Sequence, residues 1–308
     1  MNNNSTNCPI CESSNTIFHS KFRNKNEVFN NLKKFICNDC ELVFSFPMPN
    51  DDSLNNYNAG YHQNAHGGHK RDYKLEAFFR GIAKCRLNTL ENHINFNTSN
   101  SFRVLEIGPG PGVFAKEWLS KYQKTDYHVI ETDTSVHYKL NDLGIKIIKE
   151  PDLESNKSFY DLIIISHVLE HVTDPIKFLG NFVKSLKKDG HLFIEVPCRD
   201  WDHKDEDEPH LLFFEKKSFE SLIKKINLKK IFIGYFGTKI KNLKDPLFMF
   251  LNKLKQKLFY RNINIYNAER NNLMKILKSK IETNATINFS PHIEQNTPSW
   301  WLRVIIKK

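Results

Sequence analysis

Long apolar runs are missing from this sequence. Hydrophobic residues make up 40% of the 308 positions, yet no stretch approaches the roughly 20 consecutive apolar residues of a membrane-spanning helix. The first seven residues are polar and rich in asparagine, so a secretory signal peptide is not expected either. These two absences predict a soluble, cytoplasmic protein.

A triphosphate-binding loop is also missing. The glycines at 108, 110 and 112 have the spacing G-x-G-x-G, and no Lys-Ser or Lys-Thr pair follows them. A phosphate loop needs that lysine to reach the phosphates and that hydroxyl to bind magnesium. The G-x-G-x-x-G spacing of dinucleotide enzymes is not matched either. We therefore do not expect a nucleoside triphosphate as ligand.

Negative charge is the scarcer sign in the sequence. The sequence contains 45 Lys and Arg residues and 35 Asp and Glu residues, which gives a net charge of +10. Such an excess permits binding to nucleic acid, to a membrane surface or to a phosphorylated substrate. Because the lysines are spread along most of the chain, the excess is equally consistent with a charged surface that keeps the protein in solution.

The stretch around residues 103–121 contains a glycine-rich turn between a strand-like and a helix-like segment. The apolar run 104–107 ends in Gly108, Gly110 and Gly112, and a helical pattern begins at Val113. Glycine lets the backbone turn with positive φ and lets a ligand approach the main chain closely. The free N–H groups of the following helix add hydrogen-bond donors. The arrangement predicts a nucleotide-type binding loop.

Two carboxylates accompany this loop. Glu106 lies two positions before the first glycine, and Glu131 follows a second predicted strand at 127–130. A carboxylate at the second position can accept hydrogen bonds from both ribose hydroxyls of an adenosine ligand. Asp133 is the competing candidate for that role. We therefore expect Glu131, rather than Asp133, to hold the ribose.

With these residues in view, the stretch resembles the first motif of class I S-adenosylmethionine-dependent methyltransferases. The blocks at 160–172 and 186–197 resemble the fourth-strand and fifth-strand blocks of that family, in the same order, and the resemblance covers roughly residues 101–236. It implies S-adenosyl-L-methionine as cofactor. The cofactor contacts that it implies in this chain are Glu106, Gly108, Gly110, Gly112, Glu131, Asp152, Ser166 and His167.

The hydrophobic pattern of the same region alternates between strand and helix, which predicts an α/β fold with a mostly parallel sheet buried on both faces. The resemblance implies a Rossmann-like sheet of seven strands, the last of them antiparallel. A Lys/Arg-rich helical insertion is predicted at 237–297, before the strand at 300–306. Strands are predicted at 102–107, 127–131, 145–149, 161–166, 191–197 and 228–236, and helices at 112–121, 135–142, 174–188 and 216–226.

Four of the six cysteines form two C-x-x-C pairs, Cys8 with Cys11 and Cys37 with Cys40. Two such pairs form knuckles whose thiolates converge on one tetrahedral zinc ion. A pair of disulfides is the alternative, and a reducing cytosol disfavours it. A site with four cysteine ligands has no open position, so the Zn²⁺ would be structural rather than catalytic.

These features predict three parts. Residues 1–48 form a zinc ribbon, 49–100 a helical linker or cofactor lid, and 101–308 the methyltransferase core. The order resembles bacterial methyltransferases of sugar and secondary-metabolite pathways. In the sugar C-methyltransferases among them, tyrosines of the linker lie against cofactor and substrate, which implies that role for Tyr57 and Tyr61. Packing between the modules is the alternative for both tyrosines.

Three histidines are candidates for a catalytic base, because imidazole titrates near neutral pH. His167 and His171 stand at and just beyond the predicted fourth strand, where open α/β sheets bind ligands. His210 follows the fifth strand, and we favour it as base or substrate contact over a purely structural loop residue. The acidic run 205–208 before it either binds a divalent ion or forms a solvated loop.

The function predicted from these residues is methyl transfer to a hydroxyl of a small molecule such as a sugar, nucleotide sugar or glycan precursor. Sugar C-methylation is a variant. The alternative is an rRNA or tRNA methyltransferase, since a zinc ribbon with positive charge also resembles that class. Against RNA, the Asp/Asn-Pro-Pro-Tyr/Phe element of base-amino methylators is absent and no Arg-rich stripe with interleaved aromatics is evident. A scaffold without catalysis is the third alternative.

Overall fold

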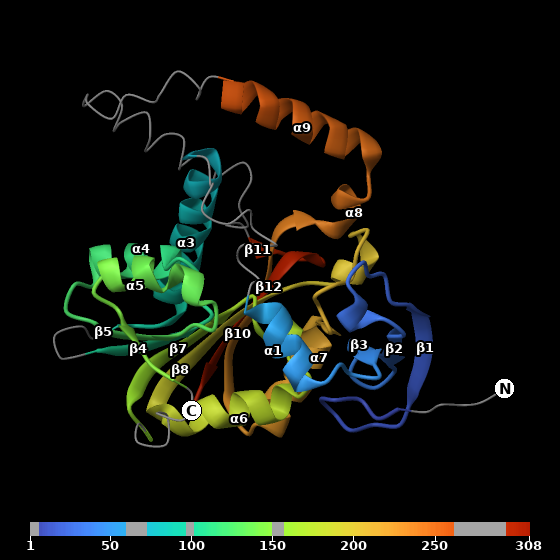
Figure 1. Cartoon of the computed structure of the whole chain (residues 1–308), viewed down its shortest axis with the longest axis horizontal. Helices are drawn as coiled ribbons and strands as arrows, with labels where there is room; N and C mark the ends of the chain where they lie inside the picture. Colours follow the sequence, from blue (N-terminus) through green and yellow to red (C-terminus); the bar gives the residue numbers. More distant parts are fainter. Residues whose placement is uncertain (1–5, 60–72, 97–101, 150–156, 262–293) are drawn as a thin grey trace.

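The computed structural model of the chain is an α/β fold around one large twisted sheet (Figure 1). It describes residues 6–59, 73–96, 102–149, 157–261 and 294–308. The order of the sheet is β11-β10-β12-β8-β7-β4-β5-β6. Its strands are β4 (Arg103–Ile107), β5 (Asp126–Ile130), β6 (Lys146–Ile147), β7 (Tyr160–Ser166), β8 (Leu186–Pro197), β10 (Lys229–Lys239), β11 (Glu294–Gln295) and β12 (Ser299–Lys307).

The strands that were predicted as parallel are parallel. β4 pairs in parallel with β5 and β7, β5 with β6, and β7 with β8. The predicted antiparallel last strand is confirmed, because β12 runs antiparallel between β8 and β10. The described part of the sheet has one strand more than the seven expected, since the two-residue β11 pairs with the end of β10.

Helices cover both faces of the sheet, as a sheet with near-continuous apolar strands requires. On one face α3, α4 and α5 pack over Val104, Val129 and Leu162. On the other, α6 and α7 pack over strand residues such as Ile163 and Val304. The helices are α3 (Tyr73–His93), α4 (Val113–Lys121), α5 (His137–Asp142), α6 (Pro175–Ser185) and α7 (Lys216–Lys225).

The helix starts follow from local sequence. Asp174 caps α6 by accepting a hydrogen bond from the backbone N–H of Lys177, and Pro175 occupies the first turn, where its missing N–H costs nothing. Glu215 is the N-cap of α7. Its side chain and the hydroxyl of Ser218 satisfy each other's backbone groups. α6 ends three residues before its predicted end because β8 already begins at Leu186.

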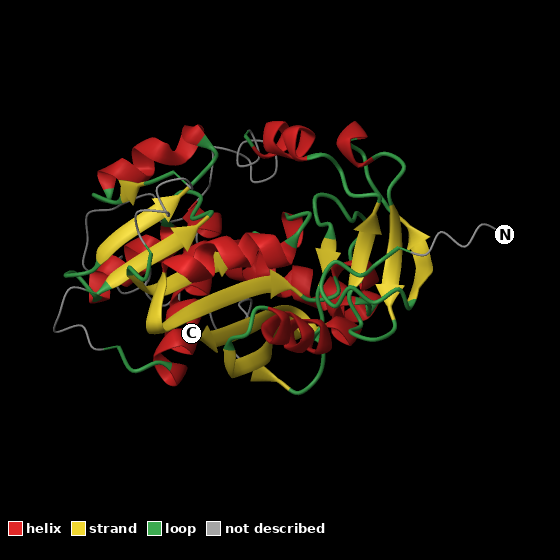
Figure 2. Ribbon diagram, turned by 90° about the horizontal axis from the view of Figure 1, so that it is seen from below, coloured by secondary structure: helices red, strands yellow, loops and turns green. Residues whose placement is uncertain are grey.

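A second, smaller sheet lies near the N-terminus of the chain (Figure 2). Its order is β1-β2-β3-β9, and its strands are β1 (Thr16–Lys21), β2 (Lys33–Cys37), β3 (Val43–Phe46) and β9 (Leu212–Phe213). β9 belongs to the segment after β8 and pairs with β3. The predicted boundary at residue 48 therefore separates β1, β2 and β3 from β9, the fourth strand of the same sheet.

Within the described residues, three helices lie outside these layers. α1 (Asp51–Asn58) follows the small sheet, and α8 (Ile240–Leu243) and α9 (Pro246–Arg261) follow β10. α9 lies away from the large sheet at the upper edge of Figure 1. The sixth strand runs to Lys239, so the insertion starts a few residues later than predicted. No helix in the described part of the chain has the length and apolar content to cross a membrane.

Candidate cofactor and active site

The glycine loop lies at the carboxyl end of β4, where α/β sheets bind ligands. Gly108, Gly110 and Gly112 all have positive φ, of 65°, 54° and 72°. A methyl group on Gly108 would lie 2.6 Å from Val168 Cγ2, and one on Gly112 would lie 2.9 Å from Leu140 Cδ2. A methyl group on Gly110 would meet no described atom within 4 Å. Gly108 and Gly112 are thus required by packing, whereas no atom of the described residues fills the space beside Gly110.

Glu131 turns back onto this loop from the end of β5. One carboxylate oxygen accepts a hydrogen bond from the backbone N–H of Gly110 at 2.8 Å, and the other accepts one from Asp133 N at the same distance. Burial raises the pKa of Glu131, and these two backbone hydrogen bonds oppose part of that rise. The competitor Asp133 is buried and caps the turn that starts at Thr134. Of these two carboxylates, it is Glu131 that lies against Gly110.

Glu106 lies deeper than the loop. Its side chain is buried, and the hydroxyl of Tyr127 on the neighbouring strand donates to it at 2.7 Å. Burial raises the pKa of Glu106 to about 7, although the hydrogen bond from Tyr127 lowers it. The structure therefore gives Glu106 a protein partner beneath the loop, and its role as a cofactor contact stays a prediction.

The end of β7 brings Ser166 and His167 beside the glycine loop, because β7 and β4 are neighbours. His167 has a left-handed backbone with φ of 56°, and its N–H donates to the carbonyl of Glu195 at 2.8 Å. Its ring packs edge-on against Trp301. A non-glycine residue with such a φ is uncommon, and this conformation turns the chain sharply after the strand.

Beneath His167 lies a buried charge cluster that sequence reasoning missed. Glu195 on β8 is fully buried, with its carboxylate 2.6 Å from Arg86 Nη2, 2.6 Å from Arg303 Nε and 3.0 Å from His167 Nε2. Burial raises the pKa of Glu195, but the two guanidinium groups hold it well below its usual value. The signal in the sequence was one acid within the otherwise apolar stretch 192–196 of β8 and one base within the otherwise apolar stretch 300–306 of β12, two strands that pair.

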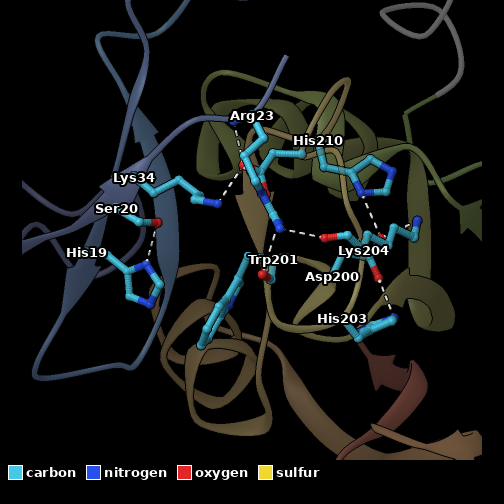
Figure 3. Close-up of polar contacts among 10 residues, drawn as sticks. His19, Ser20, Arg23, Lys34, Asp200, Trp201, His203, Lys204 and His210 are labelled. Carbon is cyan, nitrogen blue, oxygen red and sulfur yellow. Dashed lines mark hydrogen bonds and ion pairs between the residues drawn. The ribbon is translucent and has the colours of Figure 1, made fainter. Parts of the chain in front are cut away.

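His171 and His210, the other two candidate bases, lie together although 39 positions separate them in the sequence. Their ring centroids are 5.0 Å apart. The link is a short backbone pairing in which Leu211 N donates to the carbonyl of Glu170 at 2.7 Å. Asp200 lies 3.0 Å from Nδ1 of His210, and Figure 3 shows this contact beside those of His203 and Lys204. Burial lowers the pKa of His171 to about 4, so its ring is neutral at pH 7.

Tyr57 lies on α1, where its ring packs edge-on against Phe29 with centroids 5.1 Å apart. This contact fits the alternative that the tyrosine packs between the modules. Its role toward a cofactor stays a prediction. Tyr61 and Asp152 lie outside the described residues, as do residues 262–293 of the predicted helical insertion.

Neither alternative for the acidic run 205–208 holds at Asp207, which is buried and neutralised by protein cations, whereas Asp205 is exposed. The carboxylate of Asp207 lies 2.6 Å from Arg23 Nη2 and 2.5 Å from Lys34 Nζ. The backbone N–H groups of Lys25 and Asn26 donate to Glu208 at 2.9 Å. The run therefore attaches the N-terminal module to the core, and Figure 3 shows Arg23 and Lys34 converging there.

The four predicted metal ligands converge as well. The sulfur atoms of Cys8 and Cys40 are 3.5 Å apart and those of Cys11 and Cys37 are 3.4 Å apart, far beyond the roughly 2.05 Å of a disulfide. All four lie within 4.8 Å of one another. Bonds of about 2.3 Å from one zinc ion place sulfurs at comparable separations.

The backbone forms the same kind of turn after Cys8 and after Cys37. Glu12 N donates to the carbonyl of Cys8 at 2.9 Å, and Glu41 N donates to the carbonyl of Cys37 at 2.8 Å. Glu12 and Glu41 both have positive φ, of 61° and 63°. Two equal knuckles facing each other are what a tetrahedral thiolate site requires, so the residues fit the predicted zinc ion.

The model of a methyltransferase domain family matches residues 68–231, more than half of the chain. The chain belongs to this methyltransferase family. The expected family is thereby confirmed, and the matched region contains the glycine loop, Glu131 and the end of β7.

Curated relatives and a solved structure agree with the family. The ubiquinone biosynthesis O-methyltransferase of Aliivibrio fischeri is 27% identical over 142 residues, which are 41% of this chain and 57% of that protein. That of Vibrio cholerae is 28% identical over 107 residues, 30% of this chain and 41% of the relative. The chain thus spans about half the length of these relatives. Phosphoethanolamine N-methyltransferase 2 of Haemonchus contortus shares the fold, with a TM-score of 0.51 at 12% identity over 86% of this chain and 62% of that one.

Proposed function

We propose that the protein transfers the methyl group of S-adenosyl-L-methionine to a hydroxyl of a small-molecule acceptor. The observation that carries the proposal is the loop at the end of β4, where the open side of Gly110 and the Glu131 carboxylate lie against each other. The family supports methyl transfer, and the relatives named O-methyltransferases support oxygen as the acceptor atom.

In this proposal Glu131 exchanges its bond to Gly110 for the two ribose hydroxyls of the cofactor, and the open side of Gly110 receives the ligand. Ser166 and His167, at the end of the neighbouring strand, lie beside the methionine part. Methyl transfer then forms an O–CH₃ bond while the CH₃–S bond breaks. The sulfonium becomes a neutral thioether, and the hydroxyl proton leaves. The protein mainly positions the two reactants and excludes water.

For the acceptor we propose a sugar-type hydroxyl, on the strength of the resemblance of the cysteine module and linker to sugar-pathway methyltransferases. The four cysteines hold a structural Zn²⁺ in this proposal and take no part in the transfer. An RNA acceptor is not favoured, because no observation on the described residues supports it.

The cofactor site is tested by calorimetric titration with S-adenosylhomocysteine. Gly110→Val should abolish binding, because its side chain fills the space that the ligand needs. Gly144→Val is the matched control, since Gly144 also has positive φ, of 69°, and also has no described atom within 4 Å of an added methyl group. Equal binding by wild type and the Gly110 variant would refute the site.

The acceptor is tested with radiolabelled cofactor. Nucleotide sugars, simple sugars, phenols and bulk RNA are compared at equal concentration. Transfer of label to a sugar hydroxyl supports the proposal. Transfer to phenols alone would retain O-methylation and overturn the sugar acceptor, and transfer to RNA alone would overturn the small-molecule proposal.

A further inference from the structure

One face of α9 carries large apolar side chains that are exposed. They recur at the spacing i, i+3, i+4 and i+7, which places them on a single face of a helix. These residues, called the α9 stripe below, are Leu247, Phe250, Leu251 and Leu254, with exposed fractions of 65%, 59%, 54% and 40%. Single exposed apolar side chains are common, but a contiguous row of them marks an interaction surface.

Another helix of the same chain shows what this spacing ordinarily does. In α7 the residues Phe219, Leu222 and Ile223 follow the same i, i+3, i+4 pattern. All three are buried in the core that packs against the large sheet. The described residues of the chain leave the α9 stripe without such a cover.

The charge of α9 is positive. Its sequence contains no Asp or Glu, and its basic residues are Lys253, Lys255, Lys257 and Arg261. Lys253 is exposed beside Leu254 in the sequence, and Lys241 of α8 is exposed as well. An apolar helix face accompanied by lysines is typical of helices that lie in the headgroup region of an anionic membrane.

The acid that precedes the helix does not offset this charge along α9. The carboxylate of Asp245 accepts hydrogen bonds from the backbone N–H groups of Leu247 and Phe248, at 2.9 and 3.2 Å. Asp245 therefore lies at the N-terminal end of the helix, where it complements the helix dipole. The lysines and the arginine follow it by at least two turns of helix.

The start of this segment is fixed to the core, whereas α9 projects from it. Ile240 at the start of α8 is buried, and its backbone N–H donates to the carbonyl of Pro298 at 3.1 Å. Lys244 forms an ion pair with Asp202, which belongs to the segment after β8. α9 itself lies away from the large sheet in Figure 1. A broad surface can therefore approach the α9 stripe while the sheet stays as it is.

The helix leaves the same edge of the large sheet that carries the glycine loop. β12 is antiparallel to both β8 and β10, so β8 and β10 run in the same direction. β8 is in turn parallel to β7, and β7 to β4. The carboxyl end of β10, from which α8 and α9 continue, thus lies at the edge where β4 meets the loop.

We propose that the α9 stripe docks the protein on the surface of a membrane that contains anionic phospholipids. The leucines and the phenylalanine enter the boundary between headgroups and acyl chains, and the lysines extend to the lipid phosphates. The binding is peripheral, and it adds an interaction surface to the protein without entering any step of the proposed methyl transfer.

Two other occupants fit these observations less well. Single-stranded nucleic acid is bound mainly by aromatic side chains that stack on its bases, whereas three of the four stripe residues are leucines. A second copy of the chain would bring the positive charge of its own α9 against this one, which is unfavourable. Phosphates above an apolar layer complement both the charge and the apolar face.

Docking is tested by co-sedimentation of the full-length, zinc-loaded protein with vesicles. One set of vesicles is phosphatidylcholine with about 30% phosphatidylglycerol, and the other is phosphatidylcholine alone. Wild type should bind the anionic vesicles, and it should bind the neutral ones at least roughly tenfold more weakly. Binding to the anionic vesicles should fall as the salt concentration is raised, because salt screens the lysines.

Substitutions in the α9 stripe locate the contact. Phe250→Gln and Leu251→Gln should each weaken binding to the anionic vesicles at least roughly tenfold, since each removes one large apolar side chain from the contact. Lys253→Gln should weaken it roughly fivefold, and less so at high salt. Ile17→Gln is the matched control, because Ile17 is 54% exposed but lies on β1 of the smaller sheet. It should bind as wild type does.

Titration of every sample with S-adenosylhomocysteine reports on folding and on the cofactor site independently. If wild type does not sediment with the anionic vesicles, the proposal is overturned. Equal vesicle binding by wild type and both apolar variants would overturn it as well. A dimer that these variants dissociate, seen by analytical ultracentrifugation without vesicle binding, would instead assign the α9 stripe to a contact between copies. Intact binding of S-adenosylhomocysteine in each case would leave the proposed function standing.

Discussion

Replacing Asp207 with asparagine tests whether the N-terminal module is attached to the core by a buried ion pair. Asp207 is 1% exposed, and its carboxylate is shared by Arg23 and Lys34. The side chain of Lys34 is 2% exposed, whereas that of Arg23 is 38% exposed. After the substitution Arg23 can return to water, but Lys34 is left as a buried charge without its carboxylate.

The expected loss in the free energy of unfolding follows from this difference in exposure between Lys34 and Arg23. Removing one partner of a buried pair costs roughly 3–5 kcal/mol, because the remaining charge is uncompensated. Burial already lowers the pKa of Lys34, although the hydrogen bond from its ammonium to Asp207 raises it. Replacing Lys34 with methionine in the Asp207→Asn background removes the stranded charge. That second substitution should restore at least roughly 1 kcal/mol of the lost free energy of unfolding.

The assay is urea unfolding at pH 7 of the zinc-loaded protein, with amide hydrogen exchange to locate the loss. Exchange should accelerate in β1, β2 and β3 before it does so in the large sheet. Asp205→Asn is the matched control, because Asp205 is exposed and belongs to the same acidic run. It should change stability by no more than about 0.5 kcal/mol. A loss below about 1 kcal/mol for Asp207→Asn would show that the ion pair with Asp207 does not attach the module.

Three further predictions concern the metal and cofactor sites. Cys37→Ser should lose the zinc, counted by metal analysis, and lower thermal stability while S-adenosylhomocysteine still binds; an unchanged zinc content would contradict the ligand set. Glu131→Ala should weaken S-adenosylhomocysteine roughly 10–100-fold by calorimetry, since hydrogen bonds to a charged group contribute about 1.5–3 kcal/mol. Glu106→Gln should stabilise the protein above pH 7 and leave it unchanged near pH 4, measured by urea unfolding; the same difference at both pH values would rule out titration of Glu106.

The sign of the last effect follows from linkage. The pKa of Glu106 is about 7 in the folded protein against an ordinary value of 4.5, so the native state binds the proton more tightly. Stability is therefore lost as the pH rises from about 4.5 to about 7 and is constant above that range. A rise of this size corresponds to roughly 3 kcal/mol, which glutamine removes because it cannot ionise.

The element pattern of the core could be predicted because its causes are local. The apolar run of β4, the positive φ of its glycines and the cap of α6 each depend on neighbours a few residues away. The same holds for the two cysteine knuckles, whose spacing predicted that the four sulfur atoms would converge. The antiparallel β12 followed from the family resemblance rather than from its own residues.

The tertiary structure alone decided which distant charges meet. Glu195 and Arg303 form a pair because β12 lies beside β8. The register between these two strands cannot be predicted from the sequence of either strand. Asp207 looked like part of a solvated or metal-binding run until the N-terminal module supplied Arg23 and Lys34.

The same distinction explains the candidate site. Sequence by itself determined the glycine loop and Glu131, because a strand, a turn and the end of the next strand meet at one edge of a parallel sheet. It could not show that His171 and His210 lie together, since that depends on the pairing of Leu211 with Glu170. Local spacing fixes local geometry, whereas contacts between distant segments depend on how the whole chain packs.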